Sequence, residues 1–207
     1  MRSVRSPVVV KLGGSFAFSP HLPDWIAALA ACTSRTVIVP GGGPFADAVR
    51  SAQPRMGFDD RAAHHMSVLA MEQYGRALAS FNDLLLPADS ADAIGRALAA
   101  GRVPVWMPAR LVLDAPDIAP SWDATSDSLA AWLANRIGAG WLFLIKHVDL
   151  RRGRAPADEL VTTGIVDKDF VRHLRASTVA AFIFGPADHR VAAAAIRTGS
   201  AAGIAID

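Results

Sequence analysis

The chain has 207 residues, of which 52% are hydrophobic, and a formal net charge of +2 at neutral pH. This length is enough for one domain with a sizeable core. The small net charge and the arginine cluster at 151–154, which contains no aromatic residue, argue against a nucleic-acid-binding protein. Charged residues or histidines interrupt every long apolar stretch before the roughly 18 residues that a membrane-spanning helix needs. We therefore expect no membrane segment.

Cys32 is the only cysteine, so an internal disulfide cannot form. The N-terminus is basic, but the apolar stretch that follows it is too short for a secretory signal and ends at Lys11. These features lead us to expect a protein of the reducing cytoplasm.

Short apolar runs alternate along the chain with segments of helical periodicity, which is typical of a mostly parallel sheet covered by helices on both faces. The predicted elements, in chain order, are strand 8–12, helix 23–32, strand 36–39, helices 45–52, 61–84 and 91–100, strand 103–107, helix 126–137, strand 141–145, helix 169–176, strand 179–184, helix 188–198 and strand 203–206. We predict an α/β fold, a three-layer αβα sandwich around a mostly parallel open sheet. The proline-rich stretch 115–121 would separate two halves of one domain, about 1–118 and 119–207.

Two glycine-rich turns each follow a predicted strand directly, at 13–14 and at 41–43. Because glycine has no Cβ, such a turn can approach phosphate oxygens closely and point N–H groups at them. Lys11 lies beside the first turn, where its ammonium group can neutralise a transferring phosphate. Neither turn has the spacing of a Walker loop or of a dinucleotide-binding loop. Either turn alone could be a tight strand-to-helix connection, but the two together predict a phosphoryl-handling site with two anionic groups.

A polar segment at 122–128 opens the helix predicted at 126–137. Its Thr, Ser and Asp side chains can cap the helix, and that structural role is an equal alternative for any one of them. Four polar side chains exceed what a cap requires. An aspartate near two lysines can orient their ammonium groups during phosphoryl transfer. Asp127 is therefore the candidate organiser of the site.

These segments resemble, in the same order, those of the amino acid kinase family, which includes acetylglutamate, aspartate, uridylate and isopentenyl phosphate kinases. The resemblance covers most of the chain. Residues 11–15 are similar to the first phosphate loop of the family, 41–43 to its acceptor loop and 125–127 to its aspartate-bearing turn. Residues 145–149 resemble the strand end over which the nucleotide base and ribose lie, and 164–168 the element that carries a second phosphate lysine.

The resemblance implies in-line transfer of the γ-phosphoryl group of ATP, with Mg²⁺ bridging the nucleotide phosphates and held mainly by them. It implies that Lys11 and Lys168 flank the transferring group and that Asp127 holds both lysines. The implied nucleotide-binding residues are Gly13, Gly14, Ser15, Lys146, His147 and Asp149, and the implied acceptor-binding residues are Gly41, Gly42, Gly43, Thr125 and Ser126. Lys168 is also compatible with a solvated lysine near a helix start, because its motif lacks the second glycine of the family.

Within the family, the chain most resembles small members that phosphorylate an aminomethylfuran phosphate to its diphosphate in methanofuran synthesis. A flat furan with an ammonium group at one end and a phosphate at the other requires an apolar slot, a carboxylate and an anion cradle. Asp47 and Asp123 are candidate partners for the amine, although each could be a surface or capping aspartate. His64 is a candidate donor to the acceptor phosphate if its side of the helix faces the acceptor. A buried or dimer-facing histidine is the alternative.

Two other functions are open. A carboxylate kinase that makes an acyl phosphate would need a basic residue for a second carboxylate, and Arg61 or Arg110 could provide it. A nucleotide-binding regulator on the same scaffold would have no need of the transfer geometry that Lys11 and Asp127 provide. We also expect a homodimer or larger homo-oligomer, formed through the methionine- and alanine-rich helix predicted at 61–84.

Overall fold

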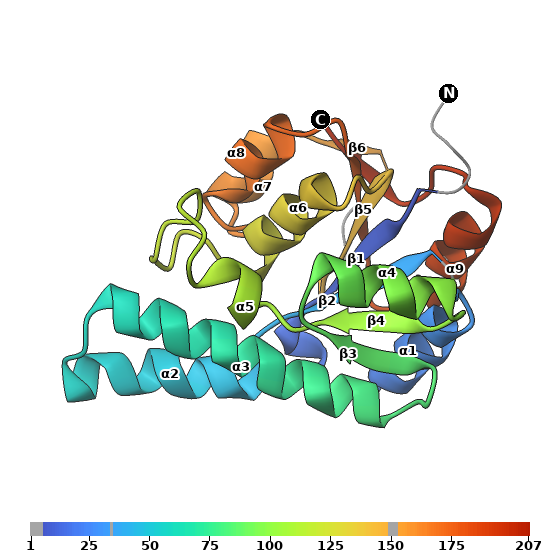
Figure 1. Ribbon diagram of the computed structural model, residues 1–207. Coiled ribbons are helices and arrows are strands. Elements are labelled where there is room, and N and C mark those ends of the chain that lie inside the picture. The colour runs from blue at the N-terminus through green and yellow to red at the C-terminus, as the bar shows by residue number, and fades with distance from the viewer. Residues whose placement is uncertain (1–5, 34, 149–152) are drawn as a thin grey trace.

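A mostly parallel sheet forms the middle of the protein in the computed structural model, which describes residues 6–33, 35–148 and 153–207 (Figure 1). The described strands run in the order β3-β4-β2-β1-β5-β7-β8-β6. Their bounds are β1 Val8–Leu12, β2 Thr36–Pro40, β3 Leu85–Ala88, β4 Val103–Trp106, β5 Trp141–Ile145, β6 Arg154–Ala155, β7 Ala180–Phe184 and β8 Ile204–Ile206. β7 and β8 pair antiparallel, and the other pairs are parallel.

Helices cover both faces of this sheet. Their bounds are η1 Gly14–Phe16, α1 Leu22–Ala30, α2 Gly43–Met56, α3 Asp60–Ser80, α4 Ala91–Ala99, α5 Ala109–Val112, α6 Ser126–Arg136, α7 Ala157–Thr162, α8 Phe170–Arg175 and α9 His189–Thr198. α6, α7 and α8 pack on one face and α1 and α9 on the other, while α2 and α3 form a hairpin that extends beyond the sheet (Figure 1). The predicted three-layer α/β fold is confirmed.

Alternation along β1 assigns its side chains to the two faces, because successive residues of a strand point to opposite sides. Val8, Val10 and Leu12 join the core beneath α1 and α9, whereas Val9 joins the core beneath α6. Lys11 has the same parity as Val9. The strand therefore directs this lysine toward α6 at the carboxyl end of the sheet.

The structure differs from the predicted elements mainly between residues 53 and 88. α2 continues past Pro54 and ends where Gly57 adopts φ 75° and donates its N–H to the Gln53 carbonyl oxygen. α3 stops at Ser80, four residues before the predicted end of this helix, and the chain turns at Asn82 into β3, which was not predicted. β6, α5 and α7 were also not predicted, because each is too short to show a clear periodicity.

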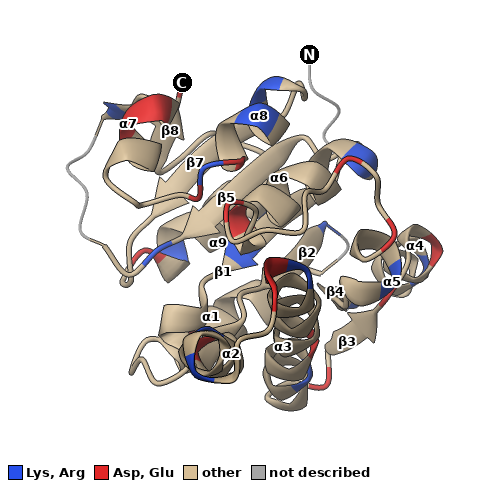
Figure 2. Ribbon diagram, turned by 90° about the vertical axis from the view of Figure 1, so that its left-hand side faces the viewer, with Lys and Arg blue, Asp and Glu red and all other residues tan. Residues whose placement is uncertain are grey.

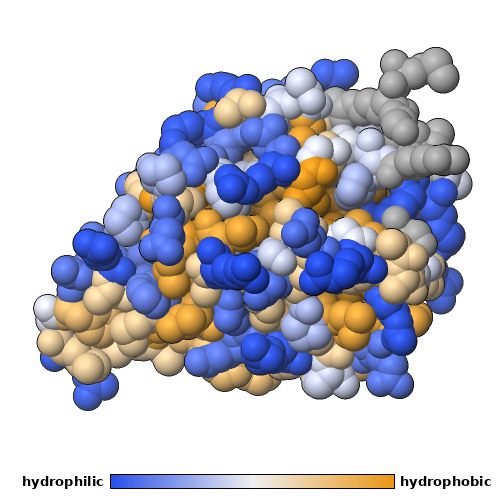
Figure 3. Space-filling model, in the orientation of Figure 1, coloured by the Kyte–Doolittle hydropathy of each residue, from blue (hydrophilic) through white to orange (hydrophobic). Residues whose placement is uncertain are grey.

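Strands β1 to β4 and strands β5 to β8 occupy opposite sides of the sheet and meet at the β1–β5 pair. The division of the domain into halves at about residue 118 stays a prediction. Hydrophilic residues cover most of the face shown in Figure 3, with hydrophobic residues exposed near its middle. In the described part of the chain, no helix has the length and hydropathy that a membrane crossing requires.

Candidate active site

The strand order reverses at the β1–β5 pair, and ligands of open α/β sheets bind beyond the carboxyl ends of the strands at such a point. Gly13 and Gly14 follow β1, the glycines at 41–43 follow β2, and Lys146 follows β5. The amino end of α6 lies over the same edge, and acidic and basic positions lie close together there (Figure 2). Four separate segments of the chain therefore meet at one place.

Asp127 lies between two lysines at this edge. Its Oδ1 atom is 2.9 Å from Lys11 Nζ, and its Oδ2 atom is 2.5 Å from Lys146 Nζ. Lys11 and Asp127 are almost fully buried, with 6% and 4% of their surface exposed. A buried carboxylate that contacts two ammonium groups can hold both of them in fixed positions.

The ionisation of this cluster follows from burial and from the three neighbouring charges. Burial alone would raise the pKa of Asp127, but attraction to Lys11 and Lys146 lowers it to about 2. Burial and then repulsion from Lys11 lower the pKa of Lys146 to about 8, against the attraction of Asp127. The carboxylate is therefore ionised at neutral pH, and Lys146 loses its proton just above neutrality.

Asp127 contacts Lys146 and not Lys168 as its second lysine, contrary to the contact that the resemblance implies, and the catalytic role of Lys168 stays a prediction. Lys168 Nζ lies 2.8 Å from Asp123 Oδ1, and 76% of its side chain is exposed. Sequence reasoning had placed Lys146 beneath the nucleotide base. The parallel pairing of β1 with β5, in which Leu12 is the register partner of Ile145, is what brings Lys146 beside Lys11.

The two glycine turns pack directly against each other. A Cβ atom on Gly41 would lie 2.3 Å from the backbone nitrogen of Gly14, and one on Gly14 would lie 2.3 Å from that of Gly43. A Cβ atom on Gly13 would lie 3.6 Å from Lys11 Nζ. Gly42 precedes the first residue of α2. The N–H groups at the start of that helix, which have no partner within the helix, therefore lie at the contact between the two turns. The absence of side chains at these glycines thus lets the two turns pack closely and leaves backbone exposed beside the lysines.

A cavity of about 280 Å³ opens beside the turns, between the α2–α3 hairpin and the start of α6. The predicted site residues that line it are Gly14, Ser15, Gly42, Gly43, Asp47, His64, Thr125 and Ser126. Asp123 instead pairs with Lys168, and Gly41 is buried in the contact between the two turns. Neither Arg61 nor Arg110 lines the cavity, and Arg110 pairs with Asp89 at 3.4 Å.

Arg50 and Trp122 form one wall of this cavity and were not predicted as site residues. The Arg50 guanidinium carbon lies 4.6 Å from the centre of the Trp122 ring, and Arg50 Nη1 is 3.0 Å from Asp47 Oδ1. Trp122 Nε1 donates a hydrogen bond of 2.7 Å to Gln53 Oε1. Asp47 and Arg50 are three residues apart and so lie on the same face of the helix. This spacing is the signal by which Arg50 could have been predicted as a site residue together with Asp47.

His64 is buried at the cavity, whereas His65 is exposed on the same helix. Burial and repulsion from His65 lower the pKa of His64, although a hydrogen bond to the Ser121 backbone acts in the opposite direction. The imidazole is therefore neutral at pH 7 and can donate one hydrogen bond. The Ser67 hydroxyl lies one helical turn further on, buried, with no hydrogen-bond partner among the described residues. His64 thus lines the cavity, and its role as a donor to the acceptor phosphate stays a prediction.

His147 is exposed just beyond β5, and its ring packs edge-on against Phe16, with the ring centres 5.4 Å apart. Gly13, Ser15 and Lys146 surround the same end of the sheet. Asp149, the remaining residue predicted to bind nucleotide, lies outside the described residues. Its role stays a prediction, as do the nucleotide-binding roles of the other residues.

The sequence model of the amino acid kinase family matches residues 6–150, more than two thirds of the chain. The chain belongs to the amino acid kinase family. A curated relative is the 5-(aminomethyl)furan-3-yl-methyl phosphate kinase of Methanocaldococcus jannaschii, which is 23% identical over 155 residues, or 74% of this chain and 71% of the relative. The resemblance seen in the sequence is confirmed at the level of the family, and with it the expected enzyme class, a phosphotransferase.

Solved structures of other kinases share the fold of this chain. The uridylate kinase of Archaeoglobus fulgidus superimposes with a TM-score of 0.73 at 19% identity, over 97% of this chain and 100% of that chain. The UMP kinase of Bacillus anthracis gives a TM-score of 0.72 at 16% identity, over 98% of this chain and 96% of that chain. These similarities support the three-layer α/β architecture.

Proposed function

We propose that this protein is an ATP-dependent kinase that transfers the γ-phosphoryl group to a small phosphorylated acceptor. The observation that carries the proposal is the buried Lys11–Asp127–Lys146 cluster, which lies at the same end of the sheet as two touching glycine turns and a cavity. A nucleotide-binding regulator would gain nothing from a buried carboxylate that fixes two ammonium groups. Transfer of a phosphoryl group requires such fixed positive charge.

In the proposed reaction, an oxygen of the acceptor phosphate attacks the γ-phosphorus, and the bond to the β,γ-bridging oxygen breaks. ADP leaves with that electron pair. A phosphate acceptor is already an anion, so no base has to remove a proton from it. Lys11 and Lys146 neutralise charge on the transferred group, Asp127 keeps them in place, and the N–H groups of the glycine turns hold the phosphates on either side.

Mg²⁺ would neutralise and bridge the nucleotide phosphates when bound. The carboxylates at the site fit an ion held mainly by those phosphates, because both oxygens of Asp127 already contact lysines. No group of three or more carboxylate, imidazole or thiol side chains with metal-binding geometry occurs in the part of the chain that the structure describes. The protein would therefore bind the ion together with the nucleotide.

For the acceptor, we propose an aminomethylfuran phosphate, which would be converted to its diphosphate in methanofuran-type synthesis. The cavity is at the small end of ligand pockets, which suits a single-ring acceptor. Trp122 offers a flat aromatic face, Asp47 a carboxylate for the ammonium group, and His64 and Ser67 two polar groups for the acceptor phosphate. The kinase of Methanocaldococcus jannaschii that acts on such a compound supports this choice.

The test is magnesium-dependent ADP release from ATP with a panel of acceptors: the aminomethylfuran phosphate, isopentenyl phosphate, UMP, acetylglutamate, glutamate and aspartate. We expect the furan phosphate to be used fastest and Lys11→Ala to abolish its turnover. Asp158→Asn, a change at an exposed ion pair on α7, serves as the control and retains turnover. Faster use of an amino acid would establish an acyl phosphate-forming kinase, and ATP binding without turnover of any acceptor would favour the regulator.

Apolar side chains on the α2–α3 hairpin support the proposal of a homodimer or larger homo-oligomer. Phe45 on α2 and Met66 and Leu69 on α3 are each about 40% exposed. Exposed apolar groups of this size on one hairpin are typical of a surface that a second subunit covers. Sedimentation equilibrium of the wild-type protein and of Leu69→Lys tests this proposal, and a wild-type monomer would contradict it.

A further inference from the structure

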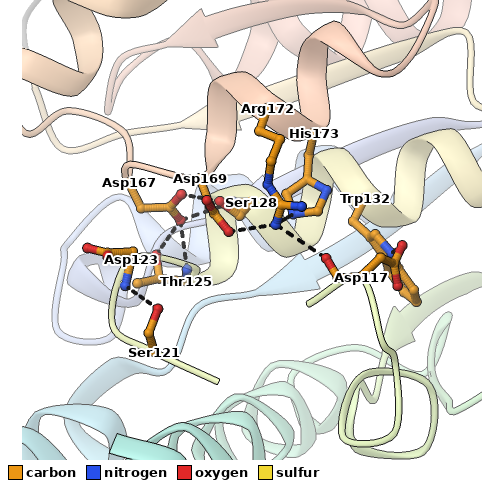
Figure 4. Close-up of polar contacts among 10 residues, drawn as sticks. All are labelled: Asp117, Ser121, Asp123, Thr125, Ser128, Trp132, Asp167, Asp169, Arg172 and His173. Carbon is orange, nitrogen blue, oxygen red and sulfur yellow. Dashed lines mark hydrogen bonds and ion pairs between the residues drawn. The ribbon is translucent and has the colours of Figure 1, made fainter. Parts of the chain in front are cut away.

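Asp167, in the turn between α7 and α8, reaches across to the start of α6 (Figure 4). Its Oδ2 atom accepts hydrogen bonds from the Thr125 backbone N–H at 2.9 Å, the Thr125 hydroxyl at 2.7 Å and the Ser128 backbone N–H at 3.1 Å. Its Oδ1 atom accepts a hydrogen bond from the Ser128 hydroxyl. Four donors from one helical turn therefore converge on a single partly buried carboxylate.

These contacts replace the cap that α6 lacks in its own sequence. Thr125 is the N-cap residue of α6, but its side chain accepts no hydrogen bond from the helix. The first N–H groups of a helix need such acceptors, and a negative charge is favourable at this end. Asp167 supplies both, although it lies 42 positions after Thr125 along the chain. The first turn of α6 is thus fixed by a residue from a distant loop.

Asp127 lies within the turn that Asp167 holds, between Thr125 and Ser128. Its orientation depends on the position of this turn, and it is the residue that contacts Lys11 and Lys146. Thr125 also lines the cavity. A displacement of the turn would therefore move the lysine-holding carboxylate and the cavity wall together.

Further contacts hold the same two segments side by side. The Asp169 backbone N–H donates to the Asp123 carbonyl oxygen at 3.0 Å, and Lys168 pairs with the Asp123 side chain. Arg172 Nη2 donates to the Asp117 carbonyl oxygen at 3.2 Å and to Asp169 Oδ2 at 2.7 Å. The loop that contains Asp167 and the start of α8 are therefore anchored at several points of the segment that leads into α6 (Figure 4).

We propose that Asp167 is a positioning residue for phosphoryl transfer, which fixes the first turn of α6 and so holds Asp127 where it presents both lysines. This inference rests on the proposed function. Asp167 touches no reacting group in this arrangement, and it acts through Asp127 and through its charge. The charged groups that act on Lys146 are Asp127, Lys11 and Asp167, and the attraction of Asp167 raises the pKa of Lys146.

Two substitutions separate the geometry from the charge. In Asp167→Asn, the amide oxygen can accept the three hydrogen bonds of Oδ2, and the amide nitrogen can donate to the Ser128 hydroxyl, so the turn is retained without the charge. Asp167→Ala removes both. Asp158→Asn is the matched control, because it removes an exposed carboxylate from the neighbouring helix α7.

We expect kcat to fall roughly 10- to 100-fold in Asp167→Ala, the range found when groups that orient ligands are removed, while KM for ATP changes little. In Asp167→Asn the alkaline limb of the kcat profile should move to lower pH, because Lys146 loses the attraction of a carboxylate and gives up its proton more easily. A folded Asp167→Ala variant with wild-type kcat would overturn the positioning role, even if its melting temperature falls. An unshifted alkaline limb in Asp167→Asn would overturn the role of the charge, and this second test stands even if Asp167→Ala does not fold.

A second readout needs neither ATP nor an acceptor. The chain has three lysines, Lys11, Lys146 and Lys168, so modification by an amine-reactive reagent can be followed at each by mass spectrometry as a function of pH. Lys146 should become reactive at lower pH in Asp167→Asn than in the wild type, and Lys168 should not change. If the wild type phosphorylates no acceptor but this shift is found, the proposed function fails while the link from Asp167 to Lys146 stands. If turnover is found without any shift, the charge effect of Asp167 on Lys146 fails while the proposed function stands.

Discussion

Lys146 Nζ lies 2.5 Å from Asp127 Oδ2, on the carboxylate whose other oxygen contacts Lys11. The second cation of the site therefore comes from the end of β5, in the middle of the sheet, and is 13% exposed at its side chain. Lys168, at 76%, lies in solvent on the far side of Asp123. Because of this difference in burial, loss of Lys146 should impair catalysis more than loss of Lys168.

Lys146→Met should lower kcat/KM for ATP at least about 100-fold, the loss typical of removing one group that stabilises transition-state charge. Lys168→Met should lower it less than about tenfold, because an exposed and mobile ammonium group is screened by solvent. Steady-state kinetics of the two variants provide the comparison, and each is the matched control of the other. An equal loss in both variants would restore Lys168 to the role that the sequence suggested.

The pKa of Lys146 predicts how turnover depends on pH. Since burial and Lys11 lower this pKa to about 8, Lys146 carries its charge below pH 8 and loses it above. The value of kcat/KM for ATP should therefore fall as the pH rises through about 8. The measurement is a pH profile of kcat/KM between pH 6 and about 10. A lysine with its ordinary pKa would stay charged over almost all of this range. A flat profile through pH 9 would show that the charge of Lys146 is not required.

Asp47→Asn should raise KM for an acceptor with an ammonium group about fivefold, the factor that corresponds to an ion pair of about 1 kcal/mol. The same variant should bind an acceptor analogue with a methyl group in place of the aminomethyl group as well as the wild type does. Initial rates with the two acceptors provide the measurement. An equal rise in KM for both would mean that Asp47 acts only through its contact with Arg50.

Gly41→Ala should destabilise the protein by about 3 kcal/mol and abolish turnover, because the new Cβ atom would meet the backbone of Gly14 at 2.3 Å. Gly95→Ala is the matched control. Gly95 lies within α4 with no atom near the position of a new Cβ, so the substitution should stabilise the protein by about 0.5–1 kcal/mol. Urea denaturation of both variants measures these changes, and a Gly41→Ala variant of wild-type stability would contradict the packing of the turns.

Local patterns were sufficient to predict six of the eight described strands and the positions of both glycine turns and of Asp127. Each of these depends on neighbours in the sequence, such as an apolar strand followed by glycines or a polar cluster before a helix. The choice between Lys146 and Lys168 depends instead on which strand pairs with β1, and the register of Leu12 with Ile145 is not encoded within either segment.

The contacts of Asp167 and Trp122 were not predicted for the same reason. Asp167 meets Thr125 across 42 positions, and Trp122 meets Gln53 across 69. β3 was not predicted, because its four residues, one of them Pro87, directly follow the helix predicted at 61–84. Only the turn at Asn82 separates them from α3, and a turn of this kind is a weak signal beside so many helix-forming residues.

The contact between the two glycine turns has a consequence for how acceptor choice changes within such an enzyme. If one turn cradles the nucleotide and the other the acceptor, the gap across which the phosphoryl group moves is set by main chain against main chain. Side chains such as Asp47, Arg50 and Trp122 line the cavity beside these turns. Substitutions there can change which molecule is admitted while the length of the transfer step stays the same.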